Sequence, residues 1–211
     1  MQVAIWTNPD EVDAALARLG LTVQPLLNSI LAGHLIRINC TENDAPNAPG
    51  FMHWNGTLRT LREELVPAAW TRCNTGGFST TVSPTGKIAV AVASGNENTG
   101  ICGAIPTTKS PKGPNTASAV QSNAAQLDLF AAFISTLPPE TPERVTWFLL
   151  FHNDGKELRG ELSLPVTMGE GGHIGLWRER IILPAQPLDT SFVLPQPDFG
   201  PDLDIDVRKR A

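Results

Sequence analysis

Two lysines and a group of hydroxyl side chains lie close together near the middle of the chain. The segment 107–116 contains Thr107, Thr108, Lys109, Ser110, Lys112 and Thr116. Ammonium and hydroxyl groups are the donors that commonly hold phosphate oxygens. The segment is therefore a candidate site for a phosphate-bearing ligand, to which Arg72 and Lys87 would add if their segments fold back. The alternative is an ordinary loop whose lysines are solvated.

The same segment differs by one residue from the phosphate-binding pattern Gly-x-x-x-x-Gly-Lys-Ser/Thr. The run from Gly103 to Ser110 has Thr108 where the second glycine is needed, and Pro111 follows directly. In the true motif a helix starts at once, so that its backbone N–H groups point at phosphate. The sequence therefore does not predict a nucleoside triphosphatase.

A polar turn follows the apolar run 88–93 and contains Asn96 and Glu97. Active sites often lie where strands end, so Glu97 is a candidate acid or base and Asn96 a candidate ligand-binding residue. Asn and Gly clusters also form turns for backbone reasons alone. Both interpretations can hold at once.

His152 and Asp154 are a candidate base and its orienting partner at the end of another strand. The alternative is that Asp154 serves only the turn Asp154-Gly155, a typical hairpin sequence. A metal site would require the fold to bring His152, His173 and a carboxylate together, since no histidine pair has metal-ligand spacing. We expect neither a metal nor a cofactor.

Trp54 lies in a segment that is rich in polar residues and bounded by prolines. An aromatic side chain there either covers the core or forms part of a surface for a partner, where Trp is enriched. We take Trp54 as the candidate partner-binding residue. Basic residues do not interleave with the aromatic ones, as a platform for single-stranded nucleic acid would require.

The elements that must position these residues begin with helices. Residues 8–20 have the N-cap, proline and acidic first turn of a helix. Residues 26–38 are apolar at helical spacing, with a strand at 35–38 as the alternative. We expect a loop over 39–56 and a helix over 57–66, which completes a helical subregion at about 8–70.

The second half is expected to form mainly strands. The run 88–93 predicts a buried strand, and a long loop over 95–116 precedes a helix at about 117–137. Segments 145–152, 158–164 and 173–183 predict an antiparallel three-strand meander within about 145–183. With an edge strand at 191–194, the sheet-rich core spans about 78–195 and a tail follows at about 196–211. The fold class is α+β, in a single domain over 1–211.

The net charge, the cysteine count and the apolar runs limit the classes of partner and the cellular compartment that we expect. The net charge is −5 with a pI of about 5.3, whereas proteins that bind nucleic acid non-specifically are usually basic. Three cysteines without a Cys-x-x-Cys pair indicate a reducing compartment. No signal peptide or membrane-length apolar run is present in the sequence. We expect a cytoplasmic protein that does not enter a membrane.

The functional expectation is a cytoplasmic binding or accessory module that acts through a protein partner, as a subunit of a complex or as a homo-oligomer. The alternative is an enzyme or sensor of a phosphate-bearing ligand, nucleotide or nucleic acid, held by the 95–116 loop. Nucleic acid is not favoured because the chain is acidic. The sequence leaves open whether the protein is an enzyme.

Overall fold

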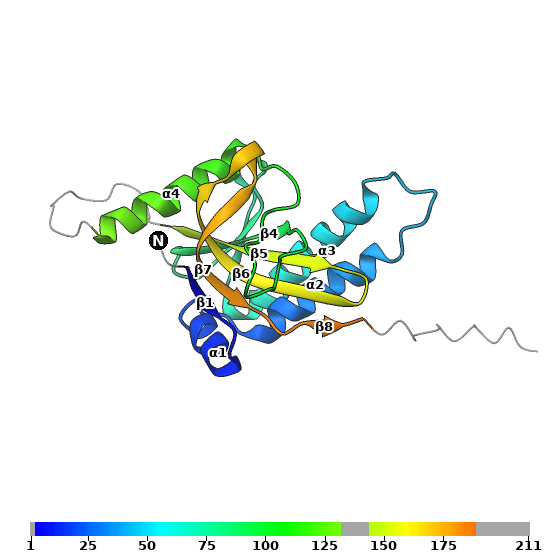
Figure 1. The fold of residues 1–211 in the computed structure, drawn as a ribbon, viewed down its shortest axis with the longest axis horizontal. Coiled ribbons are helices and arrows are strands. Elements are labelled where there is room, and N and C mark those ends of the chain that lie inside the picture. Colours follow the sequence, from blue (N-terminus) through cyan, green and yellow to red (C-terminus); the bar gives the residue numbers. More distant parts are fainter. Residues whose placement is uncertain (1–2, 132–143, 189–211) are drawn as a thin grey trace, which may run out of the picture.

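The computed structural model describes residues 3–131 and 144–188 (Figure 1). Its helices are α1 (Pro9–Ala17), α2 (Val23–Arg37), α3 (Ala48–Leu65) and α4 (Pro114–Ala131). Its strands are β1 (Ala4–Trp6), β2 (Thr71–Cys73), β3 (Thr80–Val82), β4 (Ile88–Ser94), β5 (Val145–Asn153), β6 (Glu157–Met168), β7 (Ile174–Ile182) and β8 (Gln186–Pro187). Short 3-10 turns occur at 66–68, 75–77 and 170–172.

All the described strands belong to one sheet in the order β1-β7-β6-β5-β4-β3-β2, with β8 paired to β6. Neighbouring strands are antiparallel except for β1 with β7 and β4 with β5. The expected α+β class with a mainly antiparallel sheet is confirmed. Because β4 and β5 are parallel, they need a crossover connection that returns the chain to the starting end of the sheet. The long loop and α4 belong to this connection.

Helices cover both faces of the sheet (Figure 1). Alternate strand residues point to opposite faces. Leu149 and Leu162 therefore pack with α1, α2 and α3, whereas Phe148 and Leu150 pack with Val120 of α4. The long loop and α4 share the second face, which leaves the ends of β4 and β5 between two layers.

The first two helices follow from their sequences. Asn8 caps α1, since its side-chain Oδ1 accepts a hydrogen bond from the Asp10 backbone N–H at 3.1 Å. α2 continues to Arg37, so the strand alternative for 35–38 is wrong. Its packing is the reason, because helical periodicity buries Ile30 close to Gly160 of β6 and Gly33 against α3.

The expected loop over 39–56 is wrong from Ala48 onward, where α3 begins. Pro49 does not break the helix because it lies in the first turn, where no intrahelical N–H donor is needed. Gly56 lies against Gly33 of α2, and a Cβ at Gly56 would stand 2.9 Å from the Gly33 Cα. Close helix contact thus stabilises a segment whose glycines argue against a helix.

Other boundaries also differ from the sequence prediction. β2 lies before the expected start of the sheet-rich core at about 78, and α4 starts at Pro114 rather than at 117. The predicted end of that helix at 137, the edge strand at 191–194 and the tail at 196–211 lie outside the described residues. None of the helices over 3–131 and 144–188 is long and apolar enough to cross a membrane.

Candidate functional site

A cavity of about 730 Å³, here called the basic basin, opens where β4 and β5 end. Its walls come from the end of α2, the first turns of α3, the ends of both strands and the segment 109–112. The parallel pairing of β4 and β5 brings their carboxyl ends to one edge of the sheet. Ligand sites in α/β sheets favour such an edge.

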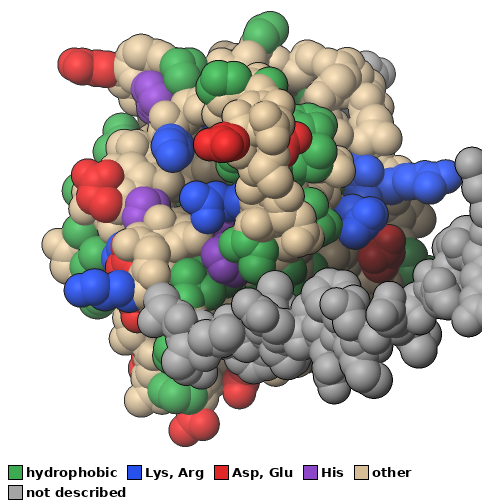
Figure 2. Space-filling model, turned by 90° about the vertical axis from the view of Figure 1, so that its right-hand side faces the viewer, with side chains coloured by type: hydrophobic (Ala, Val, Ile, Leu, Met, Phe, Trp, Pro, Cys, Tyr) green, Lys and Arg blue, Asp and Glu red, His purple; other side chains and the backbone are tan. Residues whose placement is uncertain are grey.

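The basin is lined by three basic side chains and no carboxylate. Arg37, Lys109 and Lys112 line it, and none of them forms an ion pair within 3–131 and 144–188. Burial lowers the pKa of the half-buried Lys112. Figure 2 shows Lys, Arg and His side chains close to one another on the side where the β5–β6 hairpin ends. A cavity lined by basic side chains without carboxylates favours an anion over a cation.

Two histidines line the same cavity in different surroundings. His53 of α3 is only 3 % exposed, its ring centroid lies 4.1 Å from that of Phe151, and its Nε2 has no hydrogen-bond partner among the described residues. Burial, and next the neighbouring His34, lower the pKa of His53 to about 4, so its ring is neutral at pH 7. His152 is half-buried and its Nδ1 donates to the Gly95 carbonyl at 3.3 Å.

Trp54 covers the core and lines the basin as well. Its Nε1 donates to the Val92 carbonyl at 3.0 Å, and its ring packs against the core cluster under α1–α3. Phe51, one helical turn earlier, is 54 % exposed and lies with its ring centroid 5.8 Å from that of Trp54. Helical spacing within α3 places both rings at the basin.

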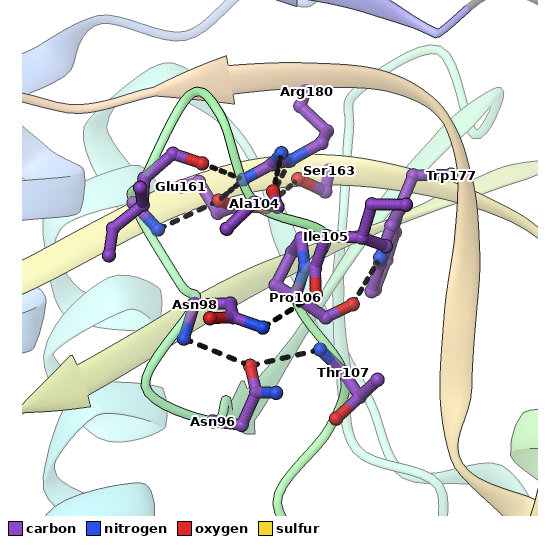
Figure 3. A network of polar contacts seen from close by, with 12 residues as sticks. Asn96, Asn98, Ala104, Ile105, Pro106, Thr107, Glu161, Ser163, Trp177 and Arg180 are labelled. Atoms are coloured by element: carbon purple, nitrogen blue, oxygen red, sulfur yellow. Dashed lines mark hydrogen bonds and ion pairs between the residues drawn. The ribbon is translucent and has the colours of Figure 1, made fainter.

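The first part of the long loop is fastened to the sheet by a buried ion pair (Figure 3). Arg180 of β7 donates to both carboxylate oxygens of Glu161 of β6, at 3.0 and 2.6 Å, and both side chains are at most 2 % exposed. Arg180 also donates to the carbonyls of Ala104 and Ile101, while Glu161 accepts from the Gly100 N–H. A bidentate pair that also binds loop backbone holds the loop in one place.

Several loop residues that the sequence singled out have structural partners. The Asn96 side-chain Oδ1 accepts from the backbone N–H groups of Asn98 and Thr107. Thr108 is 1 % exposed, and its Oγ1 accepts from the Ile174 N–H. Trp177 donates to the Pro106 carbonyl at 2.8 Å. Asn96, Thr107 and Thr108 are not among the residues that line the basin.

The candidate acids also lie outside the basin. Glu97 is exposed on the loop. Asp154 accepts from the Lys156 and Glu157 N–H groups, and these two bonds lower the pKa of its carboxyl. Its side chain thus shapes the β5–β6 turn, and no hydrogen bond joins it to His152 among the described residues. Of the predicted candidates, the structure brings together Lys109, Ser110, Lys112, His152 and Trp54.

Arg37, Phe51 and His53 line the basin without having been identified from the sequence. Arg37 ends a helix far from the lysines in sequence, while Phe51 and His53 lie where a loop is expected. The pair Glu161–Arg180 was missed too. Its signal is the alternation Arg159, Glu161 and Ser163 along β6, which puts three polar side chains on one strand face.

A second cavity of about 590 Å³ lies beside β2. Its lining includes Arg72, which the sequence analysis adds to the lysines if the segments fold back. It contains Glu63, and its Arg62 is already bound to the Cys73 and Thr80 carbonyls and to Asn74. Lys87 lies just before β4, at the opposite end of that strand from the basin. Neither Arg72 nor Lys87 therefore contributes to the basic basin.

The described residues contain no group of three or more His, Cys, Asp or Glu side chains that could hold a metal ion. His173, the proposed companion of His152, instead places its Nδ1 2.6 Å from the Thr108 carbonyl. The three cysteines are free. No protein-family model, curated protein or solved structure matches this chain.

Proposed function

We propose that the protein binds a small phosphate-bearing ligand in the basic basin and acts as a binding protein or sensor for it. The observation that carries this proposal is the set of Arg37, Lys109 and Lys112 around one cavity that has no lining carboxylate. Cations gathered in a partly enclosed place repel one another, and an anion offsets that repulsion.

Lys112 supports an anionic occupant most strongly. Its ammonium group loses part of its hydration, as the lowered pKa indicates, and it has no carboxylate partner among the described residues. A cation in this position is costly unless a negative group is near it. Phosphate oxygens supply that charge and accept charge-assisted hydrogen bonds from lysine and arginine.

The cavity's size favours a small molecule over a polymer. About 730 Å³ lies in the range of ligand pockets, roughly 300–1,000 Å³. A nucleic acid needs an extended basic surface, whereas the whole chain carries a net charge of −5. The first turn of α3 lines the basin and adds the positive end of its helix dipole.

A thermal-shift panel of inorganic phosphate, pyrophosphate and ATP tests this function. We expect pyrophosphate or ATP to raise the melting temperature, because a ligand that binds only the folded state stabilises it. Lys109→Ala combined with Lys112→Ala should abolish the increase. Lys87→Ala removes one charge at the other end of β4 and should leave it intact. No increase with any of these ligands would contradict the proposal.

A second candidate function, self-association or binding of a protein partner, rests on the outer face of α2. Leu31, Leu35 and Ile38 are 36–56 % exposed there at helical spacing. Arg37 is the only Lys, Arg, Asp or Glu in α2. A helix that is apolar on its outer side is normally covered. A second copy of the chain fits this face, because two such helices pack without burying a charge.

Sedimentation velocity over a wide concentration range tests the second candidate. We expect a dimer that Leu35→Glu converts to a monomer. Leu176→Glu, which changes an equally exposed leucine on β7, should leave the dimer unchanged. A wild-type protein that stays monomeric at every concentration would contradict self-association through α2.

A further inference from the structure

We infer that the ligand of the basic basin is a nucleotide whose base stacks on Phe51, with its phosphates at Lys109 and Lys112. This inference rests on the proposed function and narrows its ligand class. Phosphate alone needs only the cations, so the aromatic side chains at the same cavity remain to be explained.

Phe51 is an exposed aromatic side chain at the border of the basic basin. It is 54 % exposed and lines the basin, whereas Phe148 and Phe151 are at most 3 % exposed in the core. Isolated exposed apolar residues are common and need no explanation. Here the ring borders a polar cavity that already has the charges for phosphate, and a base offers a flat apolar face to cover it.

Trp54 makes this surface rigid. Its Nε1 donates a hydrogen bond to the Val92 carbonyl at 3.0 Å, and its ring packs on the core. The Trp54 ring therefore holds the neighbouring Phe51 ring, and the angle between the two ring planes is 42°. A supported ring loses little freedom when a base stacks on it. Aromatic rings and cations at one cavity are the combination that nucleotide phosphates and bases require together.

The size of the basic basin allows one nucleotide to contact Phe51 and the lysines at the same time. A volume of about 730 Å³ equals that of a sphere about 11 Å across, which is the scale of a nucleotide. Phe51 comes from the first turns of α3, and the lysines come from the second part of the long loop. These two sources form different walls of one cavity, so a base and its phosphates can contact separate groups.

Isothermal titration of AMP and ribose 5-phosphate tests the inference, because the two share the sugar and phosphate and differ in the base. We expect AMP to bind about tenfold more tightly, as expected for one base–aromatic stack. Phe51→Ala and Phe51→Leu should reduce AMP binding to the level of ribose 5-phosphate, which should itself be unaffected. Phe51→Trp should preserve the difference. Met52→Ala, a change at an exposed neighbour outside the basin, should leave both affinities unchanged.

The outcomes separate the two proposals. Equal binding of AMP and ribose 5-phosphate, with retained binding of pyrophosphate, would overturn the nucleotide inference and leave the phosphate site standing. An AMP preference that survives Phe51→Leu would overturn stacking on this ring. Failure of AMP, ribose 5-phosphate and pyrophosphate to bind at all would overturn both. Circular dichroism melting of each variant shows that a loss of binding is not a loss of fold.

Discussion

His53 is a buried titratable residue in the lining of the basin. The pKa of its ring falls from 6.5 to about 4 in the folded protein, mainly through burial and then through His34. The unfolded chain therefore binds more protons than the folded one between these values. The contribution of His53 to the free energy of unfolding is therefore fully present above pH 6.5. It is lost as the pH falls toward 4, and the loss is roughly 3 kcal/mol.

The variant His53→Gln should reduce this pH dependence. Urea unfolding of wild type and variant at pH 7 and pH 4.5 measures the change in unfolding free energy between the two pH values. Carboxylates that titrate in both proteins contribute equally to both changes and cancel when wild type and variant are compared. His34, whose pKa burial and Arg37 also lower, remains in the variant and keeps part of the slope. An unchanged difference between the two pH values would show that His53 is not buried in its neutral form.

At the residue scale, local chemistry identifies only part of the basin. Lys109, Lys112 and Ser110 are neighbours in sequence, so their spacing alone indicates a shared site. Arg37 and His53 cannot be recognised in this way, because only the packing of α2 and α3 against the ends of β4 and β5 brings them to the lysines. Burial also distinguishes His53 from a solvated histidine, and burial is a property of the fold.

At the scale of elements, the Glu161–Arg180 pair anchors the loop that joins β4 to α4. The variant Arg180→Met leaves a buried carboxylate without its partner and should cost about 3–5 kcal/mol of unfolding free energy. Arg59→Ala removes one side of an exposed pair and should cost less than about 1 kcal/mol. Urea unfolding measures both. A small loss for Arg180→Met would contradict the anchoring role.

The double variant Glu161→Leu with Arg180→Met separates stability from anchoring. Removing both charges should recover much of the stability, because the buried ion pair contributes little beyond its own desolvation. The loop would still lose its contacts at Ile101 and Ala104. Amide hydrogen exchange across residues 100–105 should therefore be faster in the double variant than in wild type. Unchanged exchange there would contradict the account.

Helices and strands with a clear local sequence signal could be predicted from the sequence. Elements that depend on contacts with distant parts of the chain could not. α1 has its cap and proline in the sequence, and β4 is a continuous apolar run. The first turns of α3 contain proline, glycine and asparagine, so only their packing on α2 makes them helical. β2 and β3 have three residues each and exist through pairing, β2 with β3 and β3 with β4. Such short strands carry little local signal.

At the scale of the whole molecule, the sheet order explains why one site forms. The parallel pairing of β4 with β5 places Ser94 and His152 at the same edge, and the crossover returns the lysines to that edge. The α+β class follows from the mixture of helical and alternating segments. The two parallel pairings connect segments far apart in the chain, and no local pattern specifies them.

Isothermal titration of pyrophosphate at pH 7 shows whether Lys112 and its neighbours hold phosphate. Wild-type protein should bind one pyrophosphate per chain. Lys112→Ala should weaken binding at least tenfold, since a charge-assisted hydrogen bond contributes about 1.5–3 kcal/mol. Lys87→Ala should bind like wild type. Absent binding in wild type, or equal weakening by Lys87→Ala and Lys112→Ala, would contradict a phosphate site in the basic basin.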